Sequence, residues 1–89
     1  MPNPASQARD LADQLLIHIL ESPELLSSLM GRSGMTPAQL RETVSGPHVH
    51  EFVMDFVTES DDRVIACAEA LGVGAGEIGM AARHLARRD

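Results

Sequence analysis

The sequence predicts an all-α protein, a compact bundle of five to six short helices, and three observations support this fold class. Apolar residues recur every three or four positions along most of the chain, as on the buried side of an amphipathic helix. Serine or threonine stands before several of these segments and is followed by proline or acidic residues, as at helix N-termini. No segment alternates apolar and polar residues with the period of a β-strand.

Two helices are expected in the first third of the chain. Residues 1–5, which include two prolines, are expected to form a flexible lead-in, and a single helical domain spans 6–89. Apolar residues at helical spacing predict a helix over 6–20. Ser22 then offers an N-cap oxygen, and Pro23 has the φ angle that suits the first position of a second helix, which "GRSG" ends. The residues that these two helices are expected to bury are Ala8, Leu11, Ala12, Leu15, Leu16, Ile19, Leu25, Leu26, Leu29 and Met30.

A capping box predicts the start of the third helix. Thr36 is its N-cap, Pro37 its first residue, and Gln39 completes the Thr-x-x-Gln pattern. The segment "SGP" at 45–47 ends this helix, and a fourth helix is expected over 47–59. The residues expected to face inward from these helices are Leu40, Val44, Val49, Val53, Phe56 and Val57, with Phe52 and Met54 at the flanks.

The last two helices are predicted from a serine and a glycine. Ser60 caps a fifth helix, Asp61 and Asp62 lie in its positive first turn, and Gly72 ends it. A sixth helix is expected over 75–88, and its first turn should fray because "GVGAG" provides no strong cap. The residues that the fifth helix is expected to bury are Val64, Cys67, Ala68 and Leu71.

The same order of signals occurs twice, which suggests an internal repeat. Ser22 and Ser60 lie 38 positions apart, and so do Gly34 and Gly72. Apolar positions also coincide at this offset, as expected of two copies of a three-helix unit that pack together. The alternative is that helical proteins often reuse serine caps and glycine ends, so that the register agrees by chance. The two repeat-like halves are 8–46 and 47–88.

Three stretches carry a resemblance to a known family. They read "ILESPELLSSLM", "SGMTPAQLRETV" and "FVMDFVTESDDRVIACAEALGV". In these the chain resembles a family of small bacterial proteins catalogued only as a domain of unknown function, over roughly residues 11–85. The resemblance implies a compact helical fold and brings no activity or site residues. Where members carry Pro-Glu after the second glycine turn, this chain has Ala75 and Gly76.

The length and composition indicate one soluble globular domain with a modest core. The chain has 89 residues, of which 44% are hydrophobic and 22% charged. Thirteen acidic residues against seven arginines give a net charge of −6. Because such a charge repels nucleic-acid phosphates and anionic lipid, neither nucleic acid nor a membrane is expected as a partner.

The lone cysteine and the N-terminus bear on the compartment. With Cys67 alone, the chain can form neither an internal disulfide nor a cysteine-based zinc site, which fits a reducing compartment. The first ten residues contain no cationic start followed by an apolar run, so no signal peptide is expected. The longest apolar run, 15–20, is too short to span a bilayer. We therefore expect a cytoplasmic protein.

An acidic face on the fourth helix is the most distinctive candidate for a binding surface. Glu51, Asp55 and Glu59 share one side of this helix, and Asp61 and Asp62 extend it into the next. A basic protein partner could dock there. The alternative is a solvated helix face whose last acids interact with a helix N-terminus.

Two further features suggest contact with a partner or with a second copy. Arg83, Arg87 and Arg88 form a basic C-terminal end that could meet the acidic face of another copy. Ile17 corresponds to the outward Asp55 at the repeat offset, so we expect it to be an exposed apolar contact. Single exposed aliphatic residues are nevertheless common.

A DNA-binding helix-turn-helix is the alternative function. The fifth and sixth helices have the small residue, tight turn and apolar anchors of that motif, and the last helix is basic. Against this, Gly74, Ala75 and Gly76 occupy the positions that would contact bases, and they have nothing to donate. The first half fits the same spacing, which indicates a generic helical corner.

Neither a metal site nor a catalytic site is expected. His48 and His50 lie two positions apart on a helix and point to different sides, although His48, Glu51 and Asp55 share a face. No nucleotide-binding fingerprint and no Ser-His-Asp pattern occurs, and Cys67 is expected to be a buried, inert thiol. The sequence thus predicts a non-enzymatic interaction domain without cofactors, which binds an unknown protein or itself.

Overall fold

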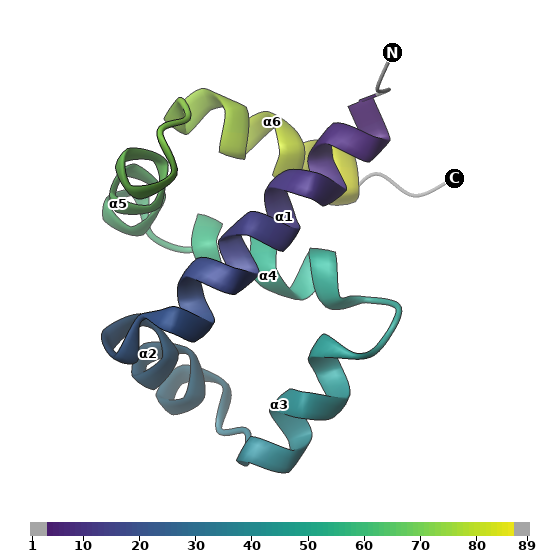
Figure 1. The fold of residues 1–89 in the computed structure, drawn as a ribbon, viewed down its shortest axis with the longest axis vertical. Helices are drawn as coiled ribbons and strands as arrows, with labels where there is room; N and C mark the ends of the chain where they lie inside the picture. The colour runs from purple at the N-terminus through teal and green to yellow at the C-terminus, as the bar shows by residue number, and fades with distance from the viewer. Residues whose placement is uncertain (1–3, 87–89) are drawn as a thin grey trace.

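The computed structural model of the chain describes residues 4–86 and folds them into six α-helices without a strand (Figure 1). The predicted all-α fold class is therefore confirmed. In chain order the helices are α1 (Pro4–Glu21), α2 (Pro23–Ser33), α3 (Pro37–Val44), α4 (Val49–Thr58), α5 (Asp61–Leu71) and α6 (Ala75–Ala86).

The predicted N-caps begin three of these helices. Ser22 Oγ and Ser60 Oγ, ahead of α2 and α5, each accept a hydrogen bond of 3.3 Å from the backbone N–H three residues further on. Ahead of α3, Thr36 Oγ1 accepts from the Gln39 N–H at 3.2 Å, and Gln39 Oε1 accepts from the Thr36 N–H at 2.9 Å. The capping box is complete, and each cap satisfies a donor that has no partner within its helix.

Two glycines end α2 and α5 as predicted. Gly34 and Gly72 both have a φ of 70°, in the left-handed region that favours glycine. The Gly34 N–H donates to the Met30 carbonyl at 2.9 Å, and the Val73 N–H donates to the Ala68 carbonyl at 3.0 Å. These bonds satisfy carbonyl groups of the last helical turn.

Some helix limits differ from those expected. Helix α1 begins at Pro4, because proline suits the first position of a helix, so Pro4 and Ala5 belong to the helix and not to the lead-in. Helix α4 is shorter than predicted at both ends. At the start of α6, Glu77 Oε2 accepts from the Gly74 N–H at 3.3 Å, a side-chain bond that the sequence analysis did not foresee. Positions 87 and 88, predicted to be helical, lie outside the described residues.

The core is drawn mainly from α1 and α4. Met54, predicted at the flank of α4, is only 2% exposed, because α6 packs over that side of the helix. Several residues predicted to be buried, including Leu11 and Leu26, are only partly covered, since a domain of this size has few fully enclosed positions. The buried residues are Ala8, Ala12, Leu15, Ile19, Leu29, Leu40, Val49, Val53, Met54, Phe56, Val57, Cys67, Ala68, Ile78 and Ala81.

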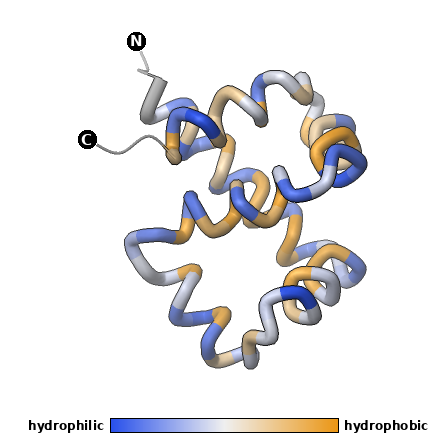
Figure 2. Tube along the Cα trace, turned by 180° about the vertical axis from the view of Figure 1, so that it is seen from behind, coloured by the Kyte–Doolittle hydropathy of each residue, from blue (hydrophilic) through white to orange (hydrophobic). Residues whose placement is uncertain are grey.

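Helix α1 crosses the middle of the molecule, with α5 and α6 on one side of it and α2 and α3 on the other (Figure 1). It packs against α2, α4, α5 and α6, and α6 also packs against α4. Helix α3 packs chiefly against α4. Along the Cα trace in Figure 2, apolar and polar segments alternate with the turns of the helices, as amphipathic packing requires. The internal repeat remains a prediction.

Within residues 4–86, no individual helix combines the length and the apolar character needed to cross a membrane. Only α5 and α6 taken together, with a bend of 111° between them, meet the test of length and composition.

Candidate functional site

The acidic face predicted on α4 is only partly available to a partner. Asp55, Asp61 and Asp62 are exposed, the last two in the first turn of α5. Glu51 is half-buried, and its Oε1 lies 3.8 Å from Nδ1 of His48, one turn earlier. Asp55 and Glu51 also border a small hollow of about 170 Å³ against α6.

Glu59 belongs to a charged cluster that joins three helices. Its carboxylate forms an ion pair with Arg32 of α2, and its Oε1 lies 3.5 Å from Nη1 of Arg63 in α5. Arg63 also donates from Nη1 to the Phe56 carbonyl at 2.6 Å, and its guanidinium lies 4.0 Å from the centre of the Phe56 ring. Glu59 therefore has a structural partner on each side, and it is a poor candidate for partner binding.

The structure describes Ile17 and, of the predicted basic end, Arg83. Ile17 is 56% exposed, as expected, and Leu20 of the same helix is 44% exposed. Arg83 is exposed, and its Nη1 lies 3.8 Å from the position that a Cβ on Gly79 would occupy. Arg87 and Arg88 lie outside the described residues. A contact role for these residues stays a prediction.

His50, weighed above as a metal ligand, and Cys67, predicted to be a buried thiol, both contact other helices of the domain. His50 Nε2 lies 2.8 Å from Asp13 Oδ1, which connects α4 to α1. Cys67 is fully buried as predicted. Burial raises the pKa of the Cys67 thiol above its ordinary value, although the nearby Arg63 guanidinium acts in the opposite direction. Among residues 4–86, no three His, Cys, Asp or Glu side chains are grouped so that they could hold a metal ion.

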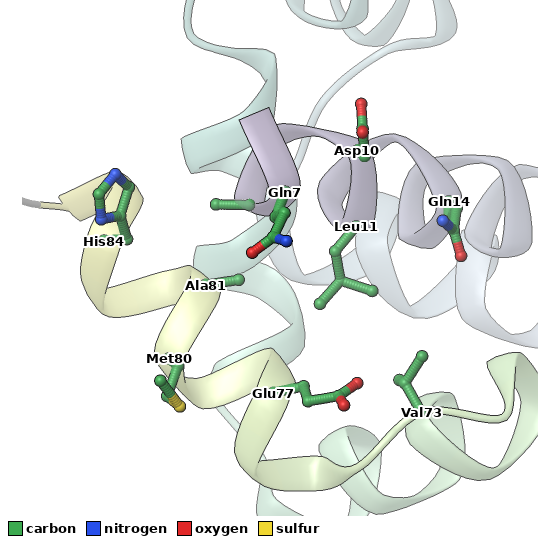
Figure 3. A pocket seen from close by; sticks show the side chains of 10 residues that line it. Gln7, Asp10, Leu11, Gln14, Val73, Glu77, Met80, Ala81 and His84 are labelled. Atoms are coloured by element: carbon green, nitrogen blue, oxygen red, sulfur yellow. The ribbon is translucent and has the colours of Figure 1, made fainter. Parts of the chain in front are cut away.

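A groove with a volume of about 520 Å³ lies between α1 and α6. Figure 3 shows Gln7 and Leu11 of α1 pointing toward α6, Asp10 pointing away from it, and the Glu77 carboxylate extending toward Val73. We call this hollow the α1–α6 groove. It is lined by Gln7, Ala8, Asp10, Leu11, Gln14, Val73, Glu77, Met80, Ala81 and His84.

The groove is bordered by matching rows of side chains on its two helices. The rows are Gln7, Asp10, Leu11 and Gln14 on α1, and Glu77, Met80, Ala81 and His84 on α6. Each row has the spacing i, i+3, i+4, i+7 of a single helix face. The aliphatic side chains of Leu11, Val73 and Ala81 provide an apolar floor, and polar side chains border it.

The ionisable groups of the groove are acidic except for one histidine. Asp10 and Glu77 are carboxylates, His84 lies at the far end of the α6 row, and no arginine is among the lining residues. Glu77 and His84 lie seven positions apart, a rise of about 10 Å along the helix. Their backbone positions are thus two turns apart on the same face of α6. The arrangement is suited to binding.

The α1–α6 groove was not predicted from the sequence. Leu11 was assigned to the core, because helix periodicity gives no information on where a neighbouring helix lies. The one available signal was Met80, an apolar residue on the same helix face as Glu77 and His84. It is 64% exposed.

A comparison with protein families places nearly the whole chain within one of them. The family described as "Protein of unknown function (DUF3572)" matches residues 5–88. The resemblance to a domain of unknown function, predicted from three stretches of the sequence, is confirmed. The comparisons with curated proteins and with solved structures found no match.

Proposed function

We propose that this chain, which belongs to the DUF3572 family of proteins of unknown function, is a non-enzymatic protein–protein interaction module of the cytoplasm. The observation that carries the proposal is the α1–α6 groove. It joins an apolar floor to a polar border, the composition of a surface that binds another protein. Its volume of about 520 Å³ also has room for several side chains of a partner.

The energetics of a small domain favour this proposal. A chain of this length encloses few residues completely, and binding a partner would cover apolar surface that folding leaves exposed. Met80, Ile17 and Leu20 are large apolar side chains of this kind. Met80 borders the groove, whereas Ile17 and Leu20 lie elsewhere on α1 and are candidates for self-association.

The exposed acids would act at longer range. Asp55, Asp61 and Asp62 add to a net charge of −6, which accelerates the encounter with a basic partner but contributes little to affinity at the rim of an interface. The acidic face, reduced to these three residues, is therefore a steering surface in this proposal. Cofactors and catalytic groups have no part in it.

The test is whether capture of a partner depends on the groove. Gln14→Trp would fill part of the groove from an exposed position, and Ser28→Trp, at an exposed position of α2 outside the groove, is the matched control. We expect the wild type and Ser28→Trp to capture at least one protein from the native lysate in similar amounts. The amount of that protein captured by Gln14→Trp should be roughly tenfold lower. Quantitative mass spectrometry of the captured proteins measures this. If all captured proteins are retained equally by the three chains, the groove is not the binding surface.

DNA binding through α5 and α6 is the second candidate. The bend of 111° between these helices lies within the range of about 90–120° found in helix-turn-helix motifs. The positions that would face bases remain Gly74, Ala75 and Gly76, and Glu77 in the first turn would repel phosphate. A titration with duplex DNA at two salt concentrations separates the candidates. Binding that weakens steeply with salt would favour the second one.

A further inference from the structure

We infer that the α1–α6 groove receives a basic amphipathic helix of a partner protein, with aliphatic side chains on the groove floor and a lysine or arginine beside Glu77. This inference rests on the proposed function, because it specifies the partner of the same groove. It is drawn from the shape, the apolar surface and the charge of the groove.

The shape of the groove suits a helix. Its two borders are single faces of α1 and α6, each extending over two turns with the spacing i, i+3, i+4, i+7. Side chains of a third helix can pack between two such rows, as ridges pack into grooves between helices. An amphipathic helix that lays its apolar face into a groove is a common form of peptide recognition.

The apolar surface of the groove suits aliphatic side chains. Met80 is 64% exposed, more than any other large apolar residue described, and Leu11 and Val73 are only partly covered. Methionine adapts its shape to different partners, because its side chain is unbranched and polarizable. An arriving helix would therefore bury Met80 together with the floor of the groove.

The charge of the groove selects a basic helix. Within the described residues only the Gly74 N–H bonds to the Glu77 carboxylate, through Oε2 at 3.3 Å, and this bond directs the carboxylate toward Val73. An apolar or acidic helix surface would remove water from Glu77 without offering it a new partner, which is unfavourable. A lysine or arginine would form a charge-assisted hydrogen bond there.

No arginine among the residues that line the groove neutralises this charge. The Arg83 guanidinium extends toward Gly79, and neither residue lines the groove. Asp10 adds a second carboxylate on the outer border. Because the Asp10 side chain points away from α6, Glu77 is the carboxylate directed along the groove.

The experiment selects peptides on the intact chain. A phage-displayed library of helical peptides is enriched on the immobilised wild type, and the affinities of the recovered peptides are measured by fluorescence anisotropy. We expect recovered peptides to carry lysine or arginine at helical spacing from aliphatic residues. Raising the ionic strength should weaken their binding, because the charge pair is partly exposed.

Four variants identify the role of each group. Glu77→Gln keeps an acceptor for the Gly74 N–H but removes the charge, and we expect binding about two- to fivefold weaker. Glu42→Gln, an exposed position of α3 outside the groove, is the matched control and should change nothing. Met80→Lys and Met80→Glu both remove the apolar contact, and only the lysine repels a basic helix. We expect Met80→Lys to weaken binding at least about tenfold, and more than Met80→Glu.

The outcomes separate the inference from the proposed function. Peptides that lack basic residues, or that bind Glu77→Gln as well as the wild type while Gln14→Trp abolishes binding, would overturn the inference and leave an interaction groove. If Gln14→Trp binds every recovered peptide as well as the wild type does, both the inference and the proposed function fail. A self-associating chain that Met80→Lys converts to monomers in analytical ultracentrifugation would show that the occupant is a second copy, which also overturns the inference.

Discussion

Helices α3 and α6 occupy corresponding places in the two halves of the chain, yet α6 packs against both α1 and α4, whereas α3 packs chiefly against α4. At the offset of 38 positions, Leu40 of α3 corresponds to Ile78 of α6. Both are buried, but Ile78 is 0% and Leu40 8% exposed. Similar local signals thus lead to helices with different shares of the core.

Residue size explains part of this difference. The inner side of α6 carries Ala81 and Ala82, whose small side chains let its backbone approach α1 and α4 closely. Helix α3 is eight residues long and buries Leu40 alone. An eight-residue helix with one buried side chain depends on its capping box more than a helix held by the core.

The largest loss of stability should come from truncating the core side chain of α6, and the loss for α3 should be smaller. Ile78→Ala removes a fully enclosed side chain from the junction of α6 with the core, and we expect a loss of about 4 kcal/mol in the free energy of unfolding. Leu40→Ala should cost about 2 kcal/mol, because its surroundings are more open and can relax. Guanidinium unfolding followed by far-UV circular dichroism measures both, since the chain has no tryptophan or tyrosine. Equal losses would mean that α3 is as firmly integrated as α6.

A smaller effect should separate the two arginines of the charged cluster. Arg63 of the second half has a side chain 20% exposed and contacts Glu59 and Phe56, whereas the side chain of Arg32 in the first half is 57% exposed. We expect Arg63→Met to cost roughly 2 kcal/mol, because the Phe56 carbonyl loses its charged donor and the ring its cation.

Arg32→Met should cost less than about 1 kcal/mol, as exposed ion pairs generally do. The same unfolding measurement applies, and Arg63→Lys is the control that keeps the charge but loses the planar guanidinium. If both methionine variants lose the same stability, the cluster depends on the Glu59 pairing alone and not on the contacts with Phe56.

The smallest losses of stability should come from replacing the two glycines that end α2 and α5, and they should be equal. Gly34 and Gly72 have the same φ of 70°, and a Cβ at either position would meet no atom within 4 Å. Gly34→Ala and Gly72→Ala should therefore each cost about 1 kcal/mol, from backbone strain alone. Thermal unfolding of both variants, with asparagine at each position as the less strained control, tests this. A larger loss at position 72 would show that this glycine also serves tertiary packing.

Candidate site residues were predictable to different degrees. The exposure of Ile17 was predicted from its correspondence with the outward Asp55 at the offset of 38 positions, and Ile17 is 56% exposed. The ion pair of Glu59 with Arg63 could have been anticipated from their spacing of four residues. Its pairing with Arg32 could not, because α2 meets α4 only through tertiary packing. Partner binding by the acidic face remains a prediction, and its member Glu59 also pairs with two arginines.

The sequence by itself determined where the helices begin and end. Ser22, Thr36 and Ser60 cap their own helices, and Gly34 and Gly72 end theirs, through bonds and backbone angles within a few residues. Such short-range interactions act before any tertiary contact exists, so they can be recognised in the chain alone.

Only the tertiary structure decided which helix faces meet. It enclosed Met54 under α6, joined Glu59 to Arg32, and opened the α1–α6 groove beside Met80. Each of these depends on the position and angle at which separate helices pack, which is set by the complementary shapes of many side chains together. Helix periodicity records that a face is apolar, whereas the packing angle decides whether that face is covered by the chain itself or left open to another molecule.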